Sequence, residues 1–247
     1  MTTFTAARAR VLGLALAVTI AAGTAVSDDA ATAAAIRLPA PRQDGTVSVE
    51  EALRLRRSVR AFTDRPLSLQ AAAQLLWAAQ GTSDPVEGKR TAPSAGATYP
   101  LELLLVAGNV AGLQPGIYRY RSGGHELVRL VAGDRRGQLA VAALRQAWLA
   151  QAPAVVVIAA VYPRTAERYG QRAERYVHME AGHAGENLYL QAVALGLATV
   201  TVGAFDDAAV REVLGLERDE TPLALMPLGI RAREPDSDGR SPARERK

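Results

Sequence analysis

A short arginine-rich stretch is the clearest candidate for anion binding in this chain. In LRRSVRAF, Arg56, Ser58 and Arg60 alternate with other residues. If the chain runs extended towards Pro66, every second side chain points to the same side, so these guanidinium groups and the hydroxyl converge. Guanidinium groups are planar donors that match phosphate oxygens, and a hydroxyl adds one short hydrogen bond. The stretch therefore predicts a phosphate site. The alternative is a solvated basic helix end, favoured by the helix dipole.

Two further segments could contact a planar ligand through their backbones. The loop APSAGATYP contains Ser94 and Gly96 among small residues, which let a ligand approach the main chain. The segment TVGAFDD brings Gly203 and Ala204 to the start of a predicted helix, where amide groups are free to donate. An ordinary surface loop and an ordinary capped helix explain the same residues as well. Only the three segments together indicate a site.

The spacing of other motifs argues against several kinds of active site. His178 and His183 are five residues apart, about 140° around a helix axis, so they cannot share a metal ion as an i, i+4 pair does. GTSDPVEGKRT lacks the spacing and the Ser or Thr of a P-loop. No G-x-G-x-x-G follows a strand, no G-x-S-x-G occurs, and the chain has no cysteine. We therefore expect neither a metal site nor a nucleophile.

The predicted elements alternate between strands and helices without a regular βαβ order. Ser48 and Ser68 are predicted to cap two helices, over about residues 49–57 and 69–80. Further strands are expected at residues 101–108, 116–120, 126–131, 154–161, 198–205 and 222–230, and further helices at 137–150, 166–197 and 207–214. The long helix is interrupted at most near Gly170, and His183 on it is expected to be a core or interface residue. A glycine-turn hairpin within this pattern favours an α+β mixed sheet.

The two ends of the chain are predicted to lie outside the folded domain. Residues 1–27 combine two arginines, a short apolar run and small residues, which is the layout of a secretory signal peptide. An upstream translation start or an uncleaved anchor would explain the same segment. We expect an exported protein, periplasmic or secreted and without stable membrane insertion, with a linker at 28–46, a domain at 47–231 and a disordered tail at 232–247. The net charge of +4 is too small for a nucleic-acid-binding face.

Five segments, in this order, resemble the nitroreductase family of FMN-dependent oxidoreductases and, within it, the SagB/ThcOx-type dehydrogenases. The segments are RRSVRAF, PSAGATYPLEL, RYVHMEAGHAGENLYLQAVALGL, VGAFDD and LMPLGIR. The resemblance covers about residues 50–231. It implies an α+β fold with a mixed, mainly antiparallel sheet flanked by helices. It also implies an interwoven homodimer that holds two FMN molecules at its interface.

The resemblance implies roles for individual residues. The expected cofactor-binding positions are Arg56, Arg57, Ser58, Arg60 and Arg231 around the phosphate and ribityl chain, Ser94 and Gly96 at the flavin border, and the amides of Gly203 and Ala204 near flavin N5. No metal is expected.

Two departures from the family pattern affect these roles. Ala97 and Tyr99 stand where typical nitroreductases have an asparagine and a glutamine that contact the flavin, which fits the SagB/ThcOx branch better. In azoline oxidases of that branch a Lys-Tyr pair is implicated in proton abstraction, and here Arg168 and Tyr169 stand in its place. Arginine stays protonated, so it cannot be that base. Tyr169 is the candidate proton donor; the alternative is a core phenol whose hydroxyl contacts water.

Together the sequence predicts an exported FMN-dependent oxidoreductase that transfers hydride through flavin N5 to or from a small organic substrate. One alternative is an azoline dehydrogenase that oxidises thiazoline or oxazoline rings in peptide maturation, which the missing lysine and the export signal make less favourable. Another is a secreted protein that binds flavin without turnover. An exported enzyme would also need an electron donor other than the cytoplasmic reduced nicotinamide nucleotides.

Overall fold

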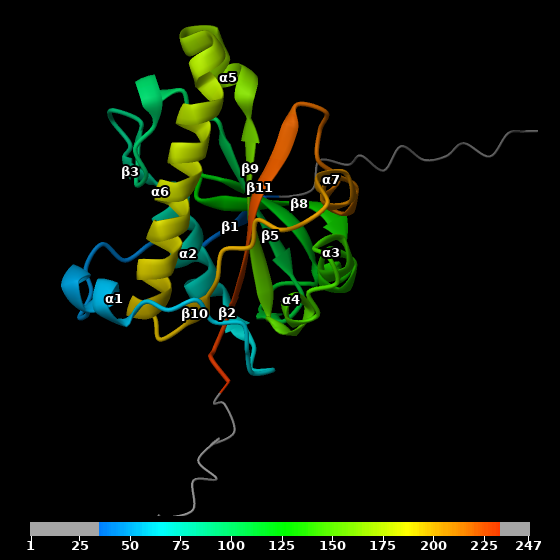
Figure 1. The fold of residues 1–247 in the computed structure, drawn as a ribbon. Helices are drawn as coiled ribbons and strands as arrows, with labels where there is room; N and C mark the ends of the chain where they lie inside the picture. Colours follow the sequence, from blue (N-terminus) through cyan, green and yellow to red (C-terminus); the bar gives the residue numbers. More distant parts are fainter. Residues whose placement is uncertain (1–34, 233–247) are drawn as a thin grey trace, which may run out of the picture. The chain divides into compact units, whose positions relative to one another are not determined.

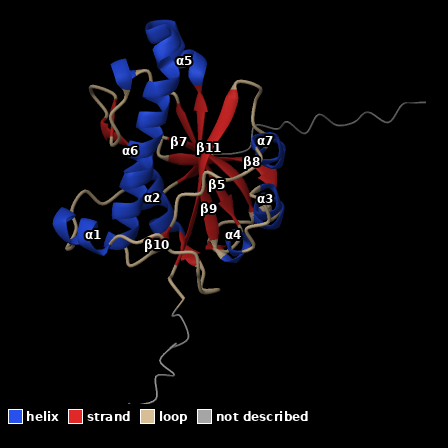
Figure 2. Cartoon of the chain, in the orientation of Figure 1, coloured by secondary structure: helices blue, strands red, loops and turns tan. Residues whose placement is uncertain are grey.

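The computed structural model of the protein describes residues 35–232, in which helices cover both faces of a seven-stranded sheet (Figures 1 and 2). The strands of the sheet are β1 (Ile36–Arg37), β5 (Leu101–Ala107), β7 (Gly116–Arg121), β8 (Glu126–Ala132), β9 (Ala154–Val161), β10 (Ala198–Thr199) and β11 (Glu220–Gly229). Their order is β1-β8-β7-β5-β9-β11-β10, and each neighbouring pair is antiparallel. Two small pairs lie outside it: β2 (Leu67–Ser68) with β6 (Val110–Ala111), and β3 (Thr82–Asp84) with β4 (Lys89–Arg90).

The helices divide between the two faces of the sheet. They are α1 (Val49–Leu55), α2 (Leu69–Gln80), α3 (Arg136–Ala142), α4 (Trp148–Gln151), α5 (Tyr162–Tyr169), α6 (Ala173–Ala194) and α7 (Asp207–Leu214). On β9, Val156 and Ile158 belong to the core under α2 and α6, while Val155 and Val157 belong to the core under α3 and α7. Because both faces are covered, the whole of β9 is buried, as its continuous apolar sequence predicts.

The predicted fold class and most predicted elements are confirmed. The chain is α+β, with a mainly antiparallel sheet flanked by helices. The Ser48 and Ser68 hydroxyls each accept a backbone amide at 3.1 Å, so both predicted helix caps are present. The long helical stretch is interrupted at Gly170, whose φ of 52° lies in the left-handed region that favours glycine.

The single helix predicted over residues 137–150 is wrong. The structure has two short helices there, α3 and α4, and Leu144 and Arg145 between them have φ values of 54° and 61°. The side-chain amide of Gln146 donates to the carbonyls of Ala143 and Ala204, each at 2.9 Å. A contact with a distant segment thus replaces the local helical hydrogen bonds that the alanine-rich sequence favours.

The strand predicted over residues 198–205 is shorter than expected. Only β10 joins the sheet, and Val202 forms an isolated pair with Leu225. Between them, the amide of Thr201 donates to the hydroxyl of Tyr189 at 2.7 Å instead of to a strand. The side chain of a helix residue therefore ends the regular pairing.

Part of the segment predicted as a linker, residues 28–46, packs against the domain. Ile36 and Arg37 pair with the start of β8, and Leu38 is 5% exposed in the core below α2. The predicted signal peptide, and all of the predicted tail except Ala232, lie outside the described residues. In residues 35–232, none of the helices has both the length and the apolar composition that a membrane span requires.

A network of charges ties α5 to the sheet. The guanidinium of Arg119 on β7 contacts both carboxylate oxygens of Glu220, one of them at 2.9 Å, and also Glu102 at 3.1 Å. Arg164 on α5 contacts the second oxygen of Glu102 at 2.6 Å. Burial raises the pKa of Glu220, but the hydrogen bonds and charge of Arg119 outweigh it, so that this pKa lies below its usual range.

We expect Glu220→Gln to lower the free energy of unfolding by about 2 kcal/mol at neutral pH, because Arg119 loses its charged partner. A carboxylate with a lowered pKa stabilises the fold above that pKa, and the contribution is lost as the pH falls through it. The difference between variant and wild type should therefore shrink in acid. Urea unfolding at several pH values measures it.

Glu126→Gln is the matched control, because Glu126 contacts Arg121 at 3.7 Å in a more exposed pair. Its effect should stay below about 0.5 kcal/mol. Equal losses in the two variants, or a Glu220→Gln loss independent of pH, would contradict the role of the network.

Candidate active site

The arginine-rich stretch follows α1 directly and is held in an extended conformation. The chain leaves the helix at Arg56, where ψ is 128°. The amide of Val59 donates to the carbonyl of Thr199 at 3.0 Å, and residues 61–63 pair antiparallel with residues 230–232. Main-chain hydrogen bonds therefore fix the stretch between β10 and the last described residues.

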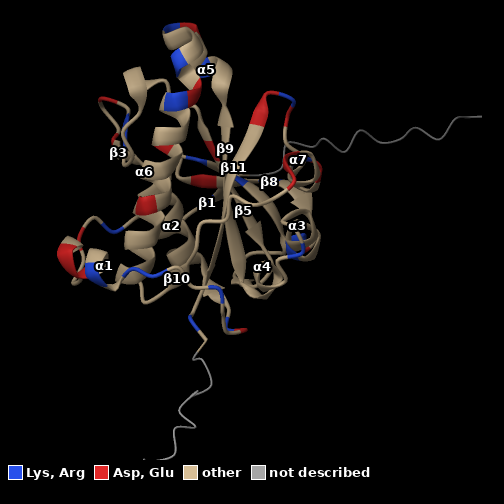
Figure 3. Ribbon diagram, in the orientation of Figure 1, with Lys and Arg blue, Asp and Glu red and all other residues tan. Residues whose placement is uncertain are grey.

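Four residues predicted for phosphate binding line one cavity of about 530 Å³: Arg57, Ser58, Arg60 and Arg231. Figure 3 shows basic residues on the segment between α1 and β10. In the described part of the chain, no carboxylate lines this cavity. Three guanidinium groups without an opposing acid give the cavity a positive potential that suits a phosphate dianion.

The arginines of the stretch differ in their contacts. Arg56 lies apart from the cavity, with its guanidinium carbon 5.0 Å from the ring centroid of Tyr189. Arg57 donates to two carbonyl oxygens at the end of α1, at 2.9 and 2.7 Å, so the alternative of a basic helix end applies to it in part. The guanidinium carbon of Arg60 lies 5.8 Å from the ring centroid of Trp148, which orients it by a cation–π contact.

Hydroxyl groups lie beside these arginines. The Tyr189 hydroxyl is 3.2 Å from the Ser58 hydroxyl and accepts the Thr201 amide at 2.7 Å. Thr199 is 1% exposed, and its hydroxyl has no hydrogen-bond partner among residues 35–232. Thr199 and Tyr189 line a second cavity, of about 230 Å³, that shares Arg57 with the first. An unpaired buried hydroxyl is unfavourable unless a ligand or water completes it.

The predicted amide donors lie in the loop between β10 and α7. Gly203 and Ala204 are exposed, and neither amide donates a hydrogen bond within the described residues. A Cβ atom added to Gly203 would meet no atom within 4 Å. Asp206 then caps α7 by accepting the Ala209 amide at 2.9 Å. The two amides are therefore available to a ligand, and they follow closely on Thr201, whose amide contacts Tyr189 at the second cavity.

Ser94, Gly96 and Tyr169 form a separate group at the junction of α5 and α6. Ser94 accepts the Tyr99 amide at 2.9 Å and closes a tight turn in which Gly96 has a φ of 59°. A Cβ atom on Gly96 would lie 2.6 Å from the Tyr169 hydroxyl, and Arg168 donates to the Gly96 carbonyl at 3.3 Å. The structure thus brings the predicted proton donor directly onto the predicted flavin loop.

The buried carboxyl group of Glu180 contacts the loop that contains Ser94. Glu180 is 2% exposed and accepts a hydrogen bond from Gln80 at 3.3 Å, and Gln80 in turn accepts one from Arg90 at 3.2 Å. Arg90 also lies 4.4 Å from the ring centroid of Tyr99. Burial raises the pKa of Glu180, partly offset by hydrogen bonds from Ser94 and Gln80 and by the charge of Arg90.

The arginine-lined cavity and the group of Ser94, Gly96 and Tyr169 contact α6 at different places. Ser58 at the cavity contacts Tyr189, and Ser94 contacts Glu180. Tyr189 and Glu180 are nine residues apart, which is about 13 Å along the helix axis and half a turn around it. A single chain therefore presents two separate parts of the predicted site.

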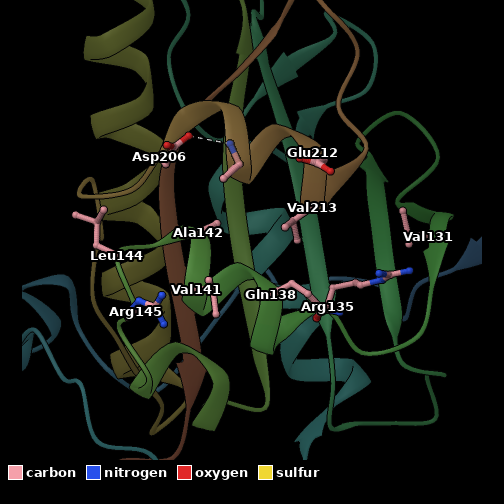
Figure 4. A pocket seen from close by; sticks show the side chains of 11 residues that line it. Val131, Arg135, Gln138, Val141, Ala142, Leu144, Arg145, Asp206, Glu212 and Val213 are labelled. Carbon is pink, nitrogen blue, oxygen red and sulfur yellow. Dashed lines mark hydrogen bonds between the residues drawn. The ribbon is translucent and has the colours of Figure 1, made fainter.

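A larger groove lies on the other face of the sheet, away from the arginine-lined cavity. It has a volume of about 910 Å³ and lies between α3 and α7 (Figure 4). Val141 and Leu144 are 59% and 64% exposed there, and its arginines are opposed by Asp206 and Glu212. The groove contains none of the predicted cofactor residues. We place the candidate site at the smaller cavity, because that is where cations gather without acids.

The sequence prediction did not single out Tyr189 or Glu180 on the long helix. Both are buried polar side chains on α6. An interruption of an apolar stripe was the available signal. His183, predicted as a core or interface residue, is exposed in the chain.

Residues 53–230 match the model of the nitroreductase family. A predicted nitroreductase of Methanocaldococcus jannaschii is 47% identical over 183 residues, which cover 74% of this chain and 91% of that protein. A crystal structure of a predicted nitroreductase from Ralstonia eutropha is similar with a TM-score of 0.70 and 29% identity, covering 81% of this chain and 90% of that one.

The Escherichia coli microcin synthetase McbBCD complex, solved with truncated pro-MccB17 bound, is similar with a TM-score of 0.64 and 22% identity. The match covers 79% of this chain and 78% of that one. At that identity the likeness concerns the fold alone.

We expect Gly96→Ala to lower the free energy of unfolding by at least about 1 kcal/mol more than Gly88→Ala, because the new methyl group is forced against the Tyr169 hydroxyl. Gly88 is the matched control: its φ is 65°, and an added Cβ meets nothing within 4 Å. Chemical unfolding measures both. Replacing Tyr169 by Phe in the Gly96→Ala background should recover part of the loss, and equal effects at the two glycines would contradict the packing.

Proposed function

The chain belongs to the nitroreductase family, a family of oxidoreductases, and on this premise we propose that it is an FMN-dependent oxidoreductase that transfers hydride to or from a small organic substrate. The observation that carries the proposal is the acid-free cavity lined by Arg57, Arg60 and Arg231 together with Ser58. A dense set of cations with a hydroxyl is what a terminal phosphate requires.

The residues present fit FMN in two further respects. The unpaired buried hydroxyl of Thr199 adjoins the phosphate cavity, where a polyhydroxylated chain could complete its hydrogen bonding. The free amides of Gly203 and Ala204 lie in the loop that follows β10, and an added Cβ atom at Gly203 would meet no atom within 4 Å. Small residues and free donors suit a planar ring with polar edges.

When bound, FMN would supply hydride transfer at its N5 atom. The arginines would hold the phosphate, while the amides of Gly203 and Ala204 would donate to the polar edge of the ring. Tyr169 carries the hydroxyl that would give a proton to the substrate, and Arg168 beside it stays protonated and cannot take one. Ala97 and Tyr99, in place of the usual amide side chains, support the SagB/ThcOx branch of the family.

We further propose a homodimer with FMN at its interface. One chain presents the arginine-lined cavity and the group of Ser94, Gly96 and Tyr169 as separate parts, and we propose that a second copy brings them together in one site. Val49 and Leu53 on α1 are 63% and 54% exposed, and Met179 on the neighbouring α6 is 54% exposed. Such apolar side chains on adjacent helices suit burial against a partner. Light scattering should give twice the chain mass, and a monomer that binds FMN would contradict the dimer.

Export is proposed from residues 1–27 alone. Fractionation of the host and N-terminal sequencing of the mature protein test it. A cytoplasmic protein with an intact N-terminus would remove the export proposal and leave the flavin proposal unchanged.

The central test is cofactor binding. We expect the pure protein to bind FMN, and Arg60→Ala to weaken binding by at least about 1.5 kcal/mol, because a charge-assisted hydrogen bond is lost. Arg65→Ala is the matched control, since Arg65 is an exposed arginine of the same segment that does not line the cavity. Flavin fluorescence titration measures both affinities.

A protein that neither binds FMN nor gains thermal stability from it would refute the proposal. Turnover is tested separately, by reducing the bound flavin and adding an organic acceptor. If no acceptor reoxidises the flavin, the chain is a flavin binder and not an oxidoreductase.

A further inference from the structure

Tyr189 on α6 contacts two separate segments, at Ser58 and at Thr201, through its single hydroxyl group. Its oxygen lies 2.7 Å from the amide nitrogen of Thr201 and 3.2 Å from the hydroxyl oxygen of Ser58. The residue is 9% exposed, so few water molecules can compete for these bonds. Ser58 is exposed and lines the cavity with the arginines. A buried hydroxyl therefore sits directly behind the exposed one.

The donor inventory fixes the direction of one of these two hydrogen bonds. An amide N–H can only donate, so the Thr201 bond uses an acceptor lone pair of the Tyr189 oxygen. The proton of the phenol stays available, and we infer that it is donated to the hydroxyl of Ser58, the acceptor within reach. Accepting the amide strengthens the phenol as a donor, because hydrogen bonds in a chain polarise one another. With the bond in this direction, the Ser58 proton points away from Tyr189.

We propose that Tyr189 is a positioning residue for the phosphate site: it orients the Ser58 hydroxyl so that Ser58 donates into the arginine-lined cavity. The inference rests on the proposed function, in which the cavity holds the FMN phosphate. Without Tyr189, the serine hydroxyl could rotate towards the strand and present a lone pair to an anion, which is repulsive. The Ser58 hydroxyl, which could either donate or accept, is thereby set to donate to the anion.

The Tyr189 ring is itself held in place. The Arg56 guanidinium carbon lies 5.0 Å from its centroid, which explains why this arginine of the stretch turns away from the cavity. Tyr189→Phe keeps the ring and this contact and removes only the hydroxyl. The substitution therefore separates the orienting role from the packing role.

The test is a double-mutant cycle on FMN affinity, with riboflavin as the second ligand because it lacks the phosphate. We expect Tyr189→Phe and Ser58→Ala each to weaken FMN binding about five- to tenfold. If Tyr189 acts through Ser58, the double variant should bind FMN no more weakly than Ser58→Ala does. Riboflavin affinity should change less than about twofold in all three variants. Fluorescence titration measures both ligands.

Tyr118→Phe is the matched control, since the buried Tyr118 donates to the carbonyl of Gln114 at 2.7 Å, away from the site. It should lower thermal stability and leave FMN affinity unchanged. Additive losses in the double variant, an unchanged FMN affinity of Tyr189→Phe, or equal losses for FMN and riboflavin would overturn the inference alone. A wild-type protein that does not bind FMN would overturn the proposed function as well.

Discussion

Backbone hydrogen bonds hold three distant parts of the chain together, and the candidate site depends on them. The segment after α1 is held on one side by the carbonyl of Thr199 and on the other by residues 230–232. Because both contacts are made by main-chain atoms, the extended course of the segment does not depend on its own side chains. Arg57, Ser58 and Arg60 are thereby free to face the cavity, where Arg231 joins them from the opposing segment. The sheet provides the rigid edge to which all of this is attached.

Local patterns predicted the parts of the fold that local forces determine. The capped helices, the hairpin and the buried β9 follow from side-chain periodicity and from capping residues, and each is present. Alternation along an extended segment predicted that Ser58 and Arg60 share one side, and both line the cavity. It also predicted Arg56 there, whereas Arg57 lines the cavity instead; Arg57 and Arg231 were expected only from the family resemblance. The family resemblance assigned Gly96 and Tyr169 to the predicted site without indicating that they touch each other.

The features that the sequence did not reveal all depend on contacts between distant residues. The helix over 137–150 is broken by a side chain that reaches Ala204, and the strand over 198–205 is cut short by the Tyr189 hydroxyl. Arg56 has the same residue type and spacing as its neighbours, yet it stacks on a ring from another helix. Propensity and periodicity contain no information about such partners, since these contacts exist only once the sheet and helices have assembled.

The pairing of residues 61–63 with residues 230–232 also has a consequence for the order in which the protein becomes functional. Chains are synthesised from the amino terminus, and domains generally fold as units. β11 lies in the interior of the sheet between β9 and β10, and Arg231 follows it directly, so nearly the whole domain must leave the ribosome before the cavity exists. A nascent chain that has exposed the arginine stretch would still lack Arg231 and Ala232, which line the other side of the cavity. A ligand could therefore bind in this cavity only after synthesis of the domain is finished.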